Sequence, residues 1–437
     1  MSSPYKTVAL HTFGCKANFA DTSLLNNQFS EIGYDVVPFD TIADVYVINT
    51  CSVTDNANKK CQYLIRRLKN RVPEALIGIT GCYAQLKPKE IISIPGVNFV
   101  VGMHDKYSFI NEIENLTIND KRLFHSDDIQ SLEDAFLAYS IDERTRSFVK
   151  IQDGCNYSCT YCTIPMARGK SRSPKINKVI DNIKKIELSN IQEVILSGIN
   201  VGDFGRGNNE SFHELLQAIN KLTKVPRIRI SSIEPNLITD KILELIGNES
   251  RFMPHLHIPL QSGSNKILRK MKRKYTVEMY IKKIEQVKKI IPECTIGADI
   301  IVGFPGESED EFMQSYDLLS ALPISYLHVF PFSERENTVA CRMKNKIKLD
   351  VKKARAKILR ELSKIKFKKL QDTSLNQVRP VLFEFNENGY MSGLTDNYLR
   401  VNVFDAKSVN YKKTNFISNV KLLKSGSEVI LGELLND

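Results

Sequence analysis

Short apolar runs alternate with amphipathic helical patterns through the first third of the chain. The strand-like runs are residues 7–13, 45–49, 76–80 and 99–101, and the helical patterns are residues 22–32, 55–71 and 107–116. Strands that alternate with helices favour a parallel sheet covered by helices. Residues 1–135 are therefore predicted to form a small parallel α/β domain. The acidic, weakly periodic segment 117–147 is interpreted as linker.

A second alternation of strands and helices begins at residue 148. Strands are predicted at 148–152, 193–197, 227–233, 255–260, 295–302 and 326–330, with helices at 174–188, 211–222, 239–247, 276–291 and 308–321. Six strands fall short of the eight in a complete barrel, whose sites lie at the C-terminal strand ends. We therefore expect a partial (β/α)6 barrel with an open side that can admit a macromolecule.

The end of the chain changes pattern again. Residues 350–370 place Val351, Ala354, Ile358, Leu362 and Ile365 at helical spacing among lysines and arginines, which predicts a basic amphipathic helix. Five short strands with glycine and asparagine turns follow, and they predict a small OB-like β-barrel. The fold class is thus α/β with a C-terminal β-barrel, divided into domains at 1–135, 136–373 and 374–437.

Charge is distributed unevenly along the 437 residues. The formal net charge of the whole chain is +11. By segment, the net charge is −3 for residues 1–135, +8 for 136–349, +6 for 350–373 and zero for 374–437. Localised lysine and arginine favour a polyanionic partner, because they replace the counterions of phosphates. No leader pattern or membrane-length apolar run is present, so we expect a cytoplasmic protein without a membrane partner.

Three cysteines stand within eight positions directly after an apolar run: Cys155, Cys159 and Cys162. An iron–sulfur cube takes four ligands, usually cysteines, so three leave one iron open to a substrate. A zinc site or three reduced thiols are alternatives. A structural zinc needs a fourth ligand at close spacing, and the next cysteine or histidine is His213.

Three further cysteines each follow a predicted strand: Cys15, Cys51 and Cys82. The carboxyl ends of parallel strands lie on one edge of a sheet, where ligands of open α/β folds bind. These cysteines can therefore converge as a second three-thiolate site, or each can be a buried core residue. Cys61, Cys294 and Cys341 have no partner at ligand spacing and are interpreted as structural.

Glycines and polar side chains gather just past the predicted barrel strands. Glycine permits close backbone approach, and the polar groups can hold a ribose or an amino acid moiety. The residues selected as candidates for binding a cofactor are Gly198, Asn200, Ser231, Glu234, Gln261, Ile301 and Gly303.

The cysteine loop is similar to that of the radical S-adenosylmethionine (SAM) enzymes, including the aromatic Tyr161 before its last cysteine. The loop, the three strand-end cysteines and the terminal barrel together resemble the tRNA methylthiotransferases over nearly the whole chain. The resemblance implies a methylthiotransferase N-terminal domain, a radical SAM domain and a C-terminal TRAM domain. It also implies two [4Fe-4S] clusters, one held by Cys15, Cys51 and Cys82 and one by Cys155, Cys159 and Cys162. Tyr161 then belongs to the cofactor site.

Particular motifs resemble one branch of that family. Gly14-Cys15-Lys16-Ala17-Asn18, together with Asp21-Thr22, is similar to the branch that acts on N6-threonylcarbamoyladenosine beside the anticodon. The stretches around Asn200, Glu234 and Gln261 are similar to the same branch. Ala17 departs from the valine common in that branch.

The activity that the resemblance implies is the addition of a methylthio group to C2 of that adenine, at position 37 of tRNA. An aromatic C–H is not acidic enough for ordinary acid–base removal, which favours radical chemistry from SAM. The implied partners are tRNA, an electron donor such as flavodoxin or ferredoxin, and a sulfur donor. Arg168, Lys170, Arg172, Arg273 and the basic helix are predicted to contact tRNA phosphates.

Two alternative functions remain open from the sequence. The methylthiotransferase chemistry can act on an isopentenyl-type adenosine of tRNA or on a ribosomal-protein side chain. The chain can also be a non-catalytic iron–sulfur protein that binds RNA.

Overall fold

The computed structural model describes residues 6–52, 55–125, 128–132, 138–140, 145–387, 389–404 and 414–435. The chain forms two compact units. Unit 1 comprises Met1–Ser140, Phe148–Pro174 and Ser333–Cys341, and unit 2 comprises Ile141–Ser147, Lys175–Phe332 and Arg342–Asp437. The cysteine loop at 155–162 thus groups with the N-terminal sheet. The predicted division into three domains stays a prediction.

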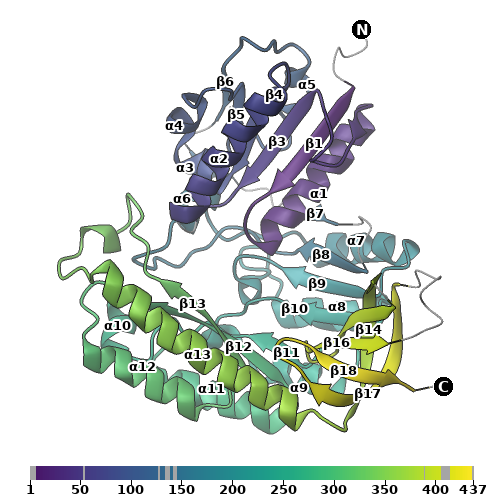
Figure 1. The fold of residues 1–437 in the computed structure, drawn as a ribbon, viewed down its shortest axis with the longest axis vertical. Coiled ribbons are helices and arrows are strands. Elements are labelled where there is room, and N and C mark those ends of the chain that lie inside the picture. The colour runs from purple at the N-terminus through teal and green to yellow at the C-terminus, as the bar shows by residue number, and fades with distance from the viewer. Residues whose placement is uncertain are drawn as a thin grey trace. The chain divides into compact units, whose positions relative to one another are not determined.

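Unit 1 is built on a six-stranded parallel sheet in the order β2-β1-β3-β4-β5-β6 (Figure 1). Its strands are β1 (Thr7–Thr12), β2 (Asp35–Val36), β3 (Val45–Thr50), β4 (Leu76–Gly81), β5 (Phe99–Val101) and β6 (Arg122–Phe124). The four strands predicted from apolar runs are confirmed. The linker interpretation of residues 117–147 is wrong at β6, which pairs in parallel with β5 and completes the sheet.

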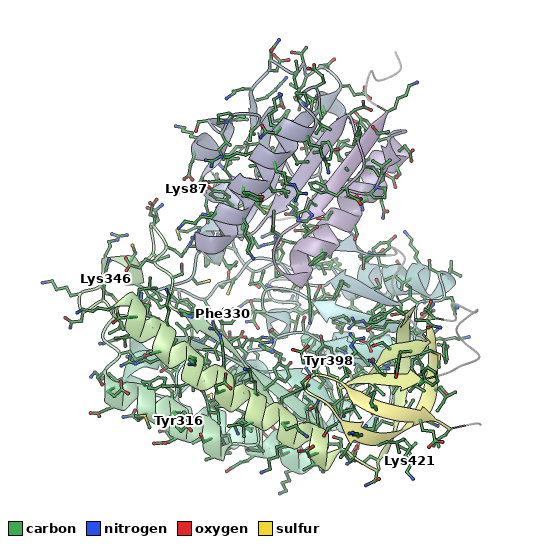
Figure 2. The ribbon with its side chains drawn as sticks, viewed as in Figure 1. Lys87, Tyr316, Phe330, Lys346, Tyr398 and Lys421 are labelled. Atoms are coloured by element: carbon green, nitrogen blue, oxygen red, sulfur yellow. The ribbon has the colours of Figure 1, made fainter. Side chains whose placement is uncertain are left out.

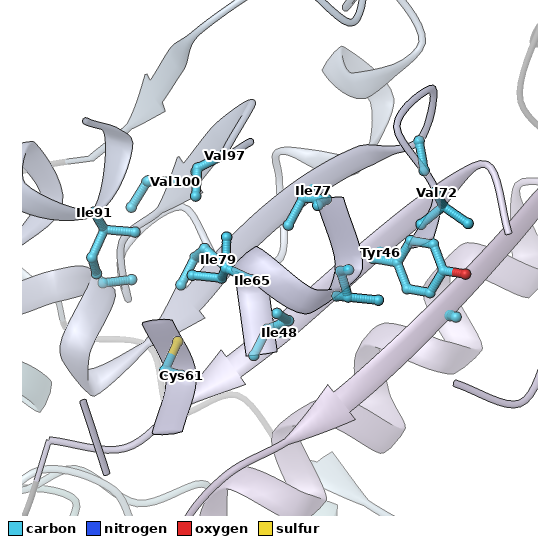
Figure 3. Packing of buried hydrophobic residues seen from close by; sticks show 14 of the residues in the cluster. Tyr46, Ile48, Cys61, Ile65, Val72, Ile77, Ile79, Ile91, Val97 and Val100 are labelled. Carbon is cyan, nitrogen blue, oxygen red and sulfur yellow. The ribbon is translucent and has the colours of Figure 1, made fainter. Parts of the chain in front are cut away.

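Helices cover both faces of this sheet, so its central strands β3 and β4 are buried at every position. On one face, α2 (Asp55–Arg71) and α4 (Pro88–Ile92) pack on Ile48, Ile77 and Ile79 through Cys61, Ile65 and Ile91 (Figure 3). On the other face, α1 (Lys16–Glu31) and α5 (Ile110–Ile113) pack on Val45 and Val47. Successive strand residues thus face opposite layers, as the strand period of two requires.

The remainder of unit 1 carries the cysteine loop. β7 (Ala138–Tyr139) pairs antiparallel with the end of β8 (Arg146–Lys150). After β8 the chain enters the loop, which leads into α6 (Ile164–Arg168). An antiparallel bridge between Asp153 and Arg172 closes the loop into a hairpin.

Unit 2 contains a run of parallel strands separated by helices. The strands are β9 (Glu193–Ser197), β10 (Arg227–Ile230), β11 (His255–His257), β12 (Thr295–Val302) and β13 (Tyr326–Pro331). β9 pairs with β10, β12 pairs with both β11 and β13, and the bridge between Ser232 and His257 links the two groups. With β8, which begins in this unit, all six predicted strands form.

Serine and threonine caps start four helices of unit 2. The helices that they cap are α8 (Phe212–Leu222), α9 (Asp240–Asn248), α11 (Val277–Ile290) and α12 (Glu309–Ala321). Ser211 and Ser308 form complete capping boxes with Glu214 and Glu311, which satisfy amides that a helix start leaves without a partner. These four helices and α7 (Ile176–Leu188) match the predicted helical patterns.

The long helix α13 (Leu349–Thr373) packs on β13 but buries a different face from the one predicted. Its buried residues are Lys352, Arg355, Ala356, Leu359, Leu362 and Gln371, whereas Ile358 and Ile365 are exposed. Arg355 forms ion pairs with Glu307 and Glu309. These pairs allow the basic Arg355 side chain to lie on the buried face of the helix. Of the predicted apolar stripe, Leu362 is buried and Val351 is half-buried, whereas the prediction is wrong at Ala354, Ile358 and Ile365, which are exposed.

The C-terminal strands close into a barrel in the order β14-β15-β16-β18-β17. They are β14 (Val378–Glu387), β15 (Tyr390–Thr395), β16 (Arg400–Phe404), β17 (Phe416–Ser425) and β18 (Ile430–Leu434). Arg227 on β10 donates hydrogen bonds to the carbonyls of Leu394 and Thr395 at 3.1 and 2.7 Å. The Tyr398 ring, labelled in Figure 2, stacks on His255 with ring centroids 4.4 Å apart. The predicted small β-barrel is confirmed.

In the part of the chain that the structure describes, no helix combines the length and apolarity needed to cross a bilayer.

Candidate functional site

Three cysteines lie at one edge of the unit 1 sheet. Cys15 precedes the first residue of α1, Cys51 follows β3 directly, and Cys82 begins α3 (Cys82–Leu86). The preceding strands β1, β3 and β4 are parallel neighbours, so their carboxyl ends meet. The placement expected from the sequence is therefore the one observed, while the role of these cysteines as metal ligands stays a prediction.

The backbone at Gly14 approaches Cys51 closely, and Cys15 lies near enough to Cys82 to act on its thiol. Gly14 has φ +114°, and a side-chain carbon there would lie 2.8 Å from Cys51 Cβ and 3.2 Å from Cys51 Sγ. Burial raises the pKa of the Cys82 thiol, nearby Arg168 opposes that rise, and Cys15 is close enough to add to it. Glycine at position 14 is thus required by both its conformation and its neighbours.

The second cysteine group lies on the hairpin loop of the same unit. Gly154 has φ +68°, and any side chain there would collide with the carbonyl of Lys170. The Cys155 amide donates to the Gly169 carbonyl at 3.1 Å, and the Cys162 amide donates to the Cys159 carbonyl at 3.1 Å. The loop is therefore held from both sides, with its three cysteines partly exposed.

The loop backbone suits thiolate ligands of an iron–sulfur cluster. The Tyr157 amide donates to Cys155 Sγ at 3.4 Å, and the Ile164 amide donates to Cys162 Sγ at 3.5 Å. Hydrogen bonds to cluster sulfurs are one means by which proteins tune such centres. Three thiols with amide donors directed at two of them fit a cluster with one open iron.

A buried network of charges lies beside the Cys82 thiol. Arg168 Nε donates to Cys82 Sγ at 3.3 Å, and its guanidinium pairs with Asp153 at 2.8 Å and Asp21 at 3.2 Å. Lys106 Nζ lies 2.9 Å from Asp21, and Lys150 contacts both carboxylates. Burial by itself raises the pKa of Asp21, but Lys106, Lys150 and Arg168 outweigh it and hold that pKa well below its ordinary value.

The network carries more cations than carboxylates. Its four cations are Lys106, Lys150, Arg168 and Arg172, its two carboxylates are Asp21 and Asp153, and all six side chains are buried. Buried charge without compensation is costly. Arg168 directs part of the positive excess at Cys82, so an anionic centre ligated by Cys15, Cys51 and Cys82 fits this environment.

The burial of three arginines corrects the expectation that they bind RNA. The Arg168, Arg172 and Arg273 side chains are 0%, 8% and 4% exposed. Arg168 and Arg172 pair with Asp153, while Arg273 pairs with Glu234 in unit 2. These cations are occupied by internal carboxylates. Of the four predicted RNA contacts, only Lys170 is an exposed residue.

The predicted cofactor residues of unit 2 follow the carboxyl ends of neighbouring strands or, for Ile301, lie within β12. Gly198 and Asn200 follow β9, Ser231 and Glu234 follow β10, and Gln261 follows β11. Gln261 accepts a hydrogen bond at its carbonyl from the Ile301 amide at 2.9 Å. Gly303, with φ +74°, donates its amide to Glu307 at 2.8 Å. Tyr161 lies in unit 1 with the cysteine loop.

The remaining cysteines occupy ordinary structural positions. Cys61 and Cys294 are 1% and 0% exposed, and burial raises the pKa of each thiol to about 12. Cys341 is partly exposed, and its amide donates to Thr338 Oγ1 at 3.3 Å.

The sequence analysis does not predict the side chains that surround Arg168 in the buried charge network. Asn18 and Asp21 were noticed only as a family motif, although Asn18 accepts a hydrogen bond from Arg168 and Asp21 binds two lysines. Lys106 carries no local signal, because its partner Asp21 is 85 residues away in the chain.

Comparison with known proteins defines the class of this site. Residues 149–319 match the model of the Radical SAM superfamily, and residues 7–102 match the model of the uncharacterized protein family UPF0004. A radical SAM methyltransferase, TsrM from Kitasatospora setae, solved with cobalamin and a [4Fe-4S] cluster bound, is similar in fold. Its TM-score is 0.56 with 12% identity, over 77% of each chain. The fold is that of a radical SAM enzyme.

Curated relatives define the family within that class. The chain is 39% identical to the threonylcarbamoyladenosine tRNA methylthiotransferase MtaB of Bacillus subtilis, over 96% of this chain and 94% of that protein. It is 30% identical to the tRNA-2-methylthio-N(6)-dimethylallyladenosine synthase of Hydrogenobaculum sp., over 98% and 99%. The chain therefore belongs to the threonylcarbamoyladenosine tRNA methylthiotransferase family of radical SAM enzymes. Enzymes of this family use [4Fe-4S] clusters and SAM.

Proposed function

We propose that this enzyme adds a methylthio group to C2 of N6-threonylcarbamoyladenosine at position 37 of tRNA. The observation that carries the proposal is the pairing of two three-cysteine sets within unit 1 of a chain 39% identical to the Bacillus subtilis enzyme. A radical SAM enzyme that only generates a radical needs one such set. The second set supports sulfur transfer.

The six cysteines form two sets, each of which is proposed to hold one iron–sulfur cluster. Cys155, Cys159 and Cys162 hold one [4Fe-4S] cluster and leave an iron open for SAM. Cys15, Cys51 and Cys82 hold an auxiliary cluster beside Arg168. When bound, the two clusters and SAM supply radical removal of the C2 hydrogen and delivery of a methylated sulfur. In unit 2 the candidates for contacts with SAM are Gly198, Asn200, Ser231, Glu234, Gln261, Ile301 and Gly303. In unit 1 the candidate is Tyr161.

The chain orients these groups through its backbone and its buried charges. The hairpin closed by Asp153 and Arg172 fixes the first cysteine set. Arg168 holds the Cys82 side chain while its guanidinium is itself fixed by Asp21 and Asp153. A change in the cysteine loop is thus transmitted to the auxiliary set through one side chain.

The partner is tRNA, which places the enzyme in the cytoplasm, and it is bound mainly by exposed lysines. Lys170 and the solvent face of α13 offer such cations in place of the buried arginines. The exposed cations of α13 are Lys353, Lys357, Arg360, Lys364, Lys368 and Lys369. Each phosphate contact that they make adds to the salt dependence of binding. A sulfur donor and an electron donor such as flavodoxin or ferredoxin complete the reaction.

The test is nucleoside analysis of tRNA. The reconstituted enzyme is incubated with SAM, sulfide and a reductant, and with tRNA carrying either threonylcarbamoyladenosine or isopentenyladenosine. We expect a methylthio product only from the first, and none from a Cys155→Ala variant. Product from isopentenyladenosine alone would move the enzyme to the branch of the 30% identical relative. Binding of tRNA without product from either substrate would instead favour a non-catalytic iron–sulfur protein.

A further inference from the structure

Two histidines and an aspartate of unit 2 lie together on three neighbouring parallel strands. His257 ends β11, Asp299 lies in β12, and His328 lies in β13. Asp299 is directly opposite His328 in the strand register, and His257 is opposite Gly297. Residues two apart on a strand share a face, so all three side chains project from the same face of this sheet.

The side chains converge on one carboxylate oxygen. His257 Nε2 lies 2.9 Å from Asp299 Oδ1, and His328 Nδ1 lies 3.3 Å from the same atom. The two imidazole rings are stacked with centroids 5.0 Å apart and planes 27° apart. All three potential ligand atoms lie within 4.8 Å of one another.

The two separations between imidazole nitrogen and carboxylate oxygen, 2.9 and 3.3 Å, suit ligands that share one ion. Zinc binds imidazole nitrogen and carboxylate oxygen at about 2.0–2.2 Å, so two of its ligands lie roughly 3 to 3.5 Å apart. Two imidazoles and one carboxylate are a donor set preferred by zinc, iron and nickel over calcium or magnesium. We propose that His257, Asp299 and His328 form a binding site for one divalent transition-metal ion, of which Zn²⁺ is the best match.

The surroundings leave the ion open on one side. His257 is buried, Asp299 is partly buried, and the His328 side chain is 54% exposed. Three protein ligands leave a coordination position for water, and the exposed side at His328 gives the ion access from solvent. Gly297, opposite His257, leaves room for the Tyr326 ring on the same face, because a side-chain carbon there would lie 2.5 Å from the Tyr326 hydroxyl.

The role of such an ion follows from where its ligands come from. Each ligand belongs to a different strand, so a bound ion joins β11, β12 and β13 across the strand direction. Without it, the same atoms form hydrogen bonds from imidazole to carboxylate. The site uses none of the six proposed cluster cysteines and no predicted cofactor residue. Metal binding there can therefore be present or absent whether or not the methylthiotransferase activity is.

Zinc uptake by the holoenzyme tests the proposal. Protein is reconstituted anaerobically so that iron and sulfide fill the cysteine sites, then exposed to two equivalents of ZnCl₂ and desalted. Zinc and iron are counted by mass spectrometry, and the zinc shell is measured by X-ray absorption. The variants are His328→Ala, Asp299→Asn and, as a matched control on α8, His213→Ala.

We expect about one zinc per chain in the wild type and in His213→Ala, and at least a tenfold loss of uptake in the other two variants. The zinc shell should contain only nitrogen and oxygen at about 2.0–2.2 Å. No uptake by the wild type, equal uptake by His328→Ala, or a sulfur shell at about 2.3 Å would overturn the site. Because the His328 side chain is half exposed, its truncation leaves the fold intact even if Asp299→Asn does not fold.

Discussion

Arg168 Nε donates a hydrogen bond to Cys82 Sγ at 3.3 Å, and both side chains are buried. Arg168 ends α6, six residues after Cys162, whereas Cys82 begins α3 at the edge of the N-terminal sheet. One side chain therefore connects the segment that carries the first cysteine set to a member of the second set. The guanidinium cannot move without disturbing Asp21 and Asp153, with which it is paired.

Replacement of Arg168 is expected to weaken the auxiliary site. Arg168→Gln leaves the Asp21 and Asp153 carboxylates without their guanidinium partner and should destabilise unit 1 by about 3–5 kcal/mol. Arg168→Lys keeps the charge but not the forked geometry, so its loss should be smaller. Thermal melting of the protein and iron content after reconstitution measure both effects. Wild-type melting and iron content in Arg168→Gln would contradict this role.

Iron content is expected to separate the two cysteine sets. Wild-type protein reconstituted anaerobically should hold about eight irons per chain, and a variant with Cys15, Cys51 and Cys82 all changed to Ala should hold about four. Cys341→Ser serves as the control, because its partly exposed thiol belongs to neither set. A wild type with only about four irons would remove the basis for sulfur transfer.

Glu193 is expected to make unit 2 sensitive to acid. Burial by itself raises the pKa of Glu193, but Arg229 and Arg227 outweigh it and lower the pKa from 4.5 to about 2. The pKa of Glu193 is lower in the folded protein than in the unfolded chain. The stabilisation that ionised Glu193 provides is therefore complete above about pH 4.5 and is lost as the pH falls toward about 2. The shift in the Glu193 pKa corresponds to a contribution of about 3 kcal/mol to the free energy of unfolding.

Glu193→Gln tests this dependence. The variant leaves two buried arginines without their carboxylate and should cost about 3–5 kcal/mol at neutral pH. Its remaining stability should depend less on pH between 3 and 6. Urea unfolding followed by circular dichroism gives both quantities, with the exposed Glu244→Gln as control. Parallel acid profiles for wild type and Glu193→Gln would exclude Glu193 as the source.

Much of the fold follows from local pattern. The apolar strands of unit 1 and the capped helices of unit 2 were predicted within a few residues, because burial and caps act over one element. β6 was missed, since only Phe124 of its three residues is buried and a short edge strand leaves little apolar signal. The C-terminal barrel was found because its strands are separated by turn residues.

The sequence predicted only those parts of the candidate site in which cysteines recur at similar positions along the chain. Cysteines at strand ends and in a tight loop stand out in sequence, but a basic residue does not reveal whether it is exposed. Arg168 and Arg273 resemble RNA contacts until their partners Asp21 and Glu234 are placed beside them. The face of α13 was misjudged for the same reason, because Arg355 is buried against Glu307. Such pairs are tertiary, and no window of sequence contains them.

The C-terminal barrel is expected to depend on Tyr398 for its attachment within unit 2. Its ring stacks on His255, and Arg229 lies over the same ring at 4.8 Å. Tyr398 has φ +76°, a conformation that a bulky side chain adopts only when its surroundings impose it. The ring contacts thus offset backbone strain at the turn between β15 and β16.

Tyr398→Gly removes the ring and relieves the strain, whereas Tyr398→Phe keeps the ring. The half-buried Tyr398 ring contacts the fully buried Arg229, and the loss of a desolvated cation–π contact costs about 2 kcal/mol. In Tyr398→Gly the amides of β15 and β16 should therefore exchange with deuterium about 30-fold faster. Tyr398→Phe keeps the ring and loses only the hydroxyl that bonds Arg146, so its exchange should accelerate far less than that of Tyr398→Gly. Phe404→Ala, which removes an exposed ring of the same barrel, should exchange like the wild type. Equal protection of β15 in all four proteins would mean that the Arg227 hydrogen bonds to Leu394 and Thr395 hold the barrel without the ring.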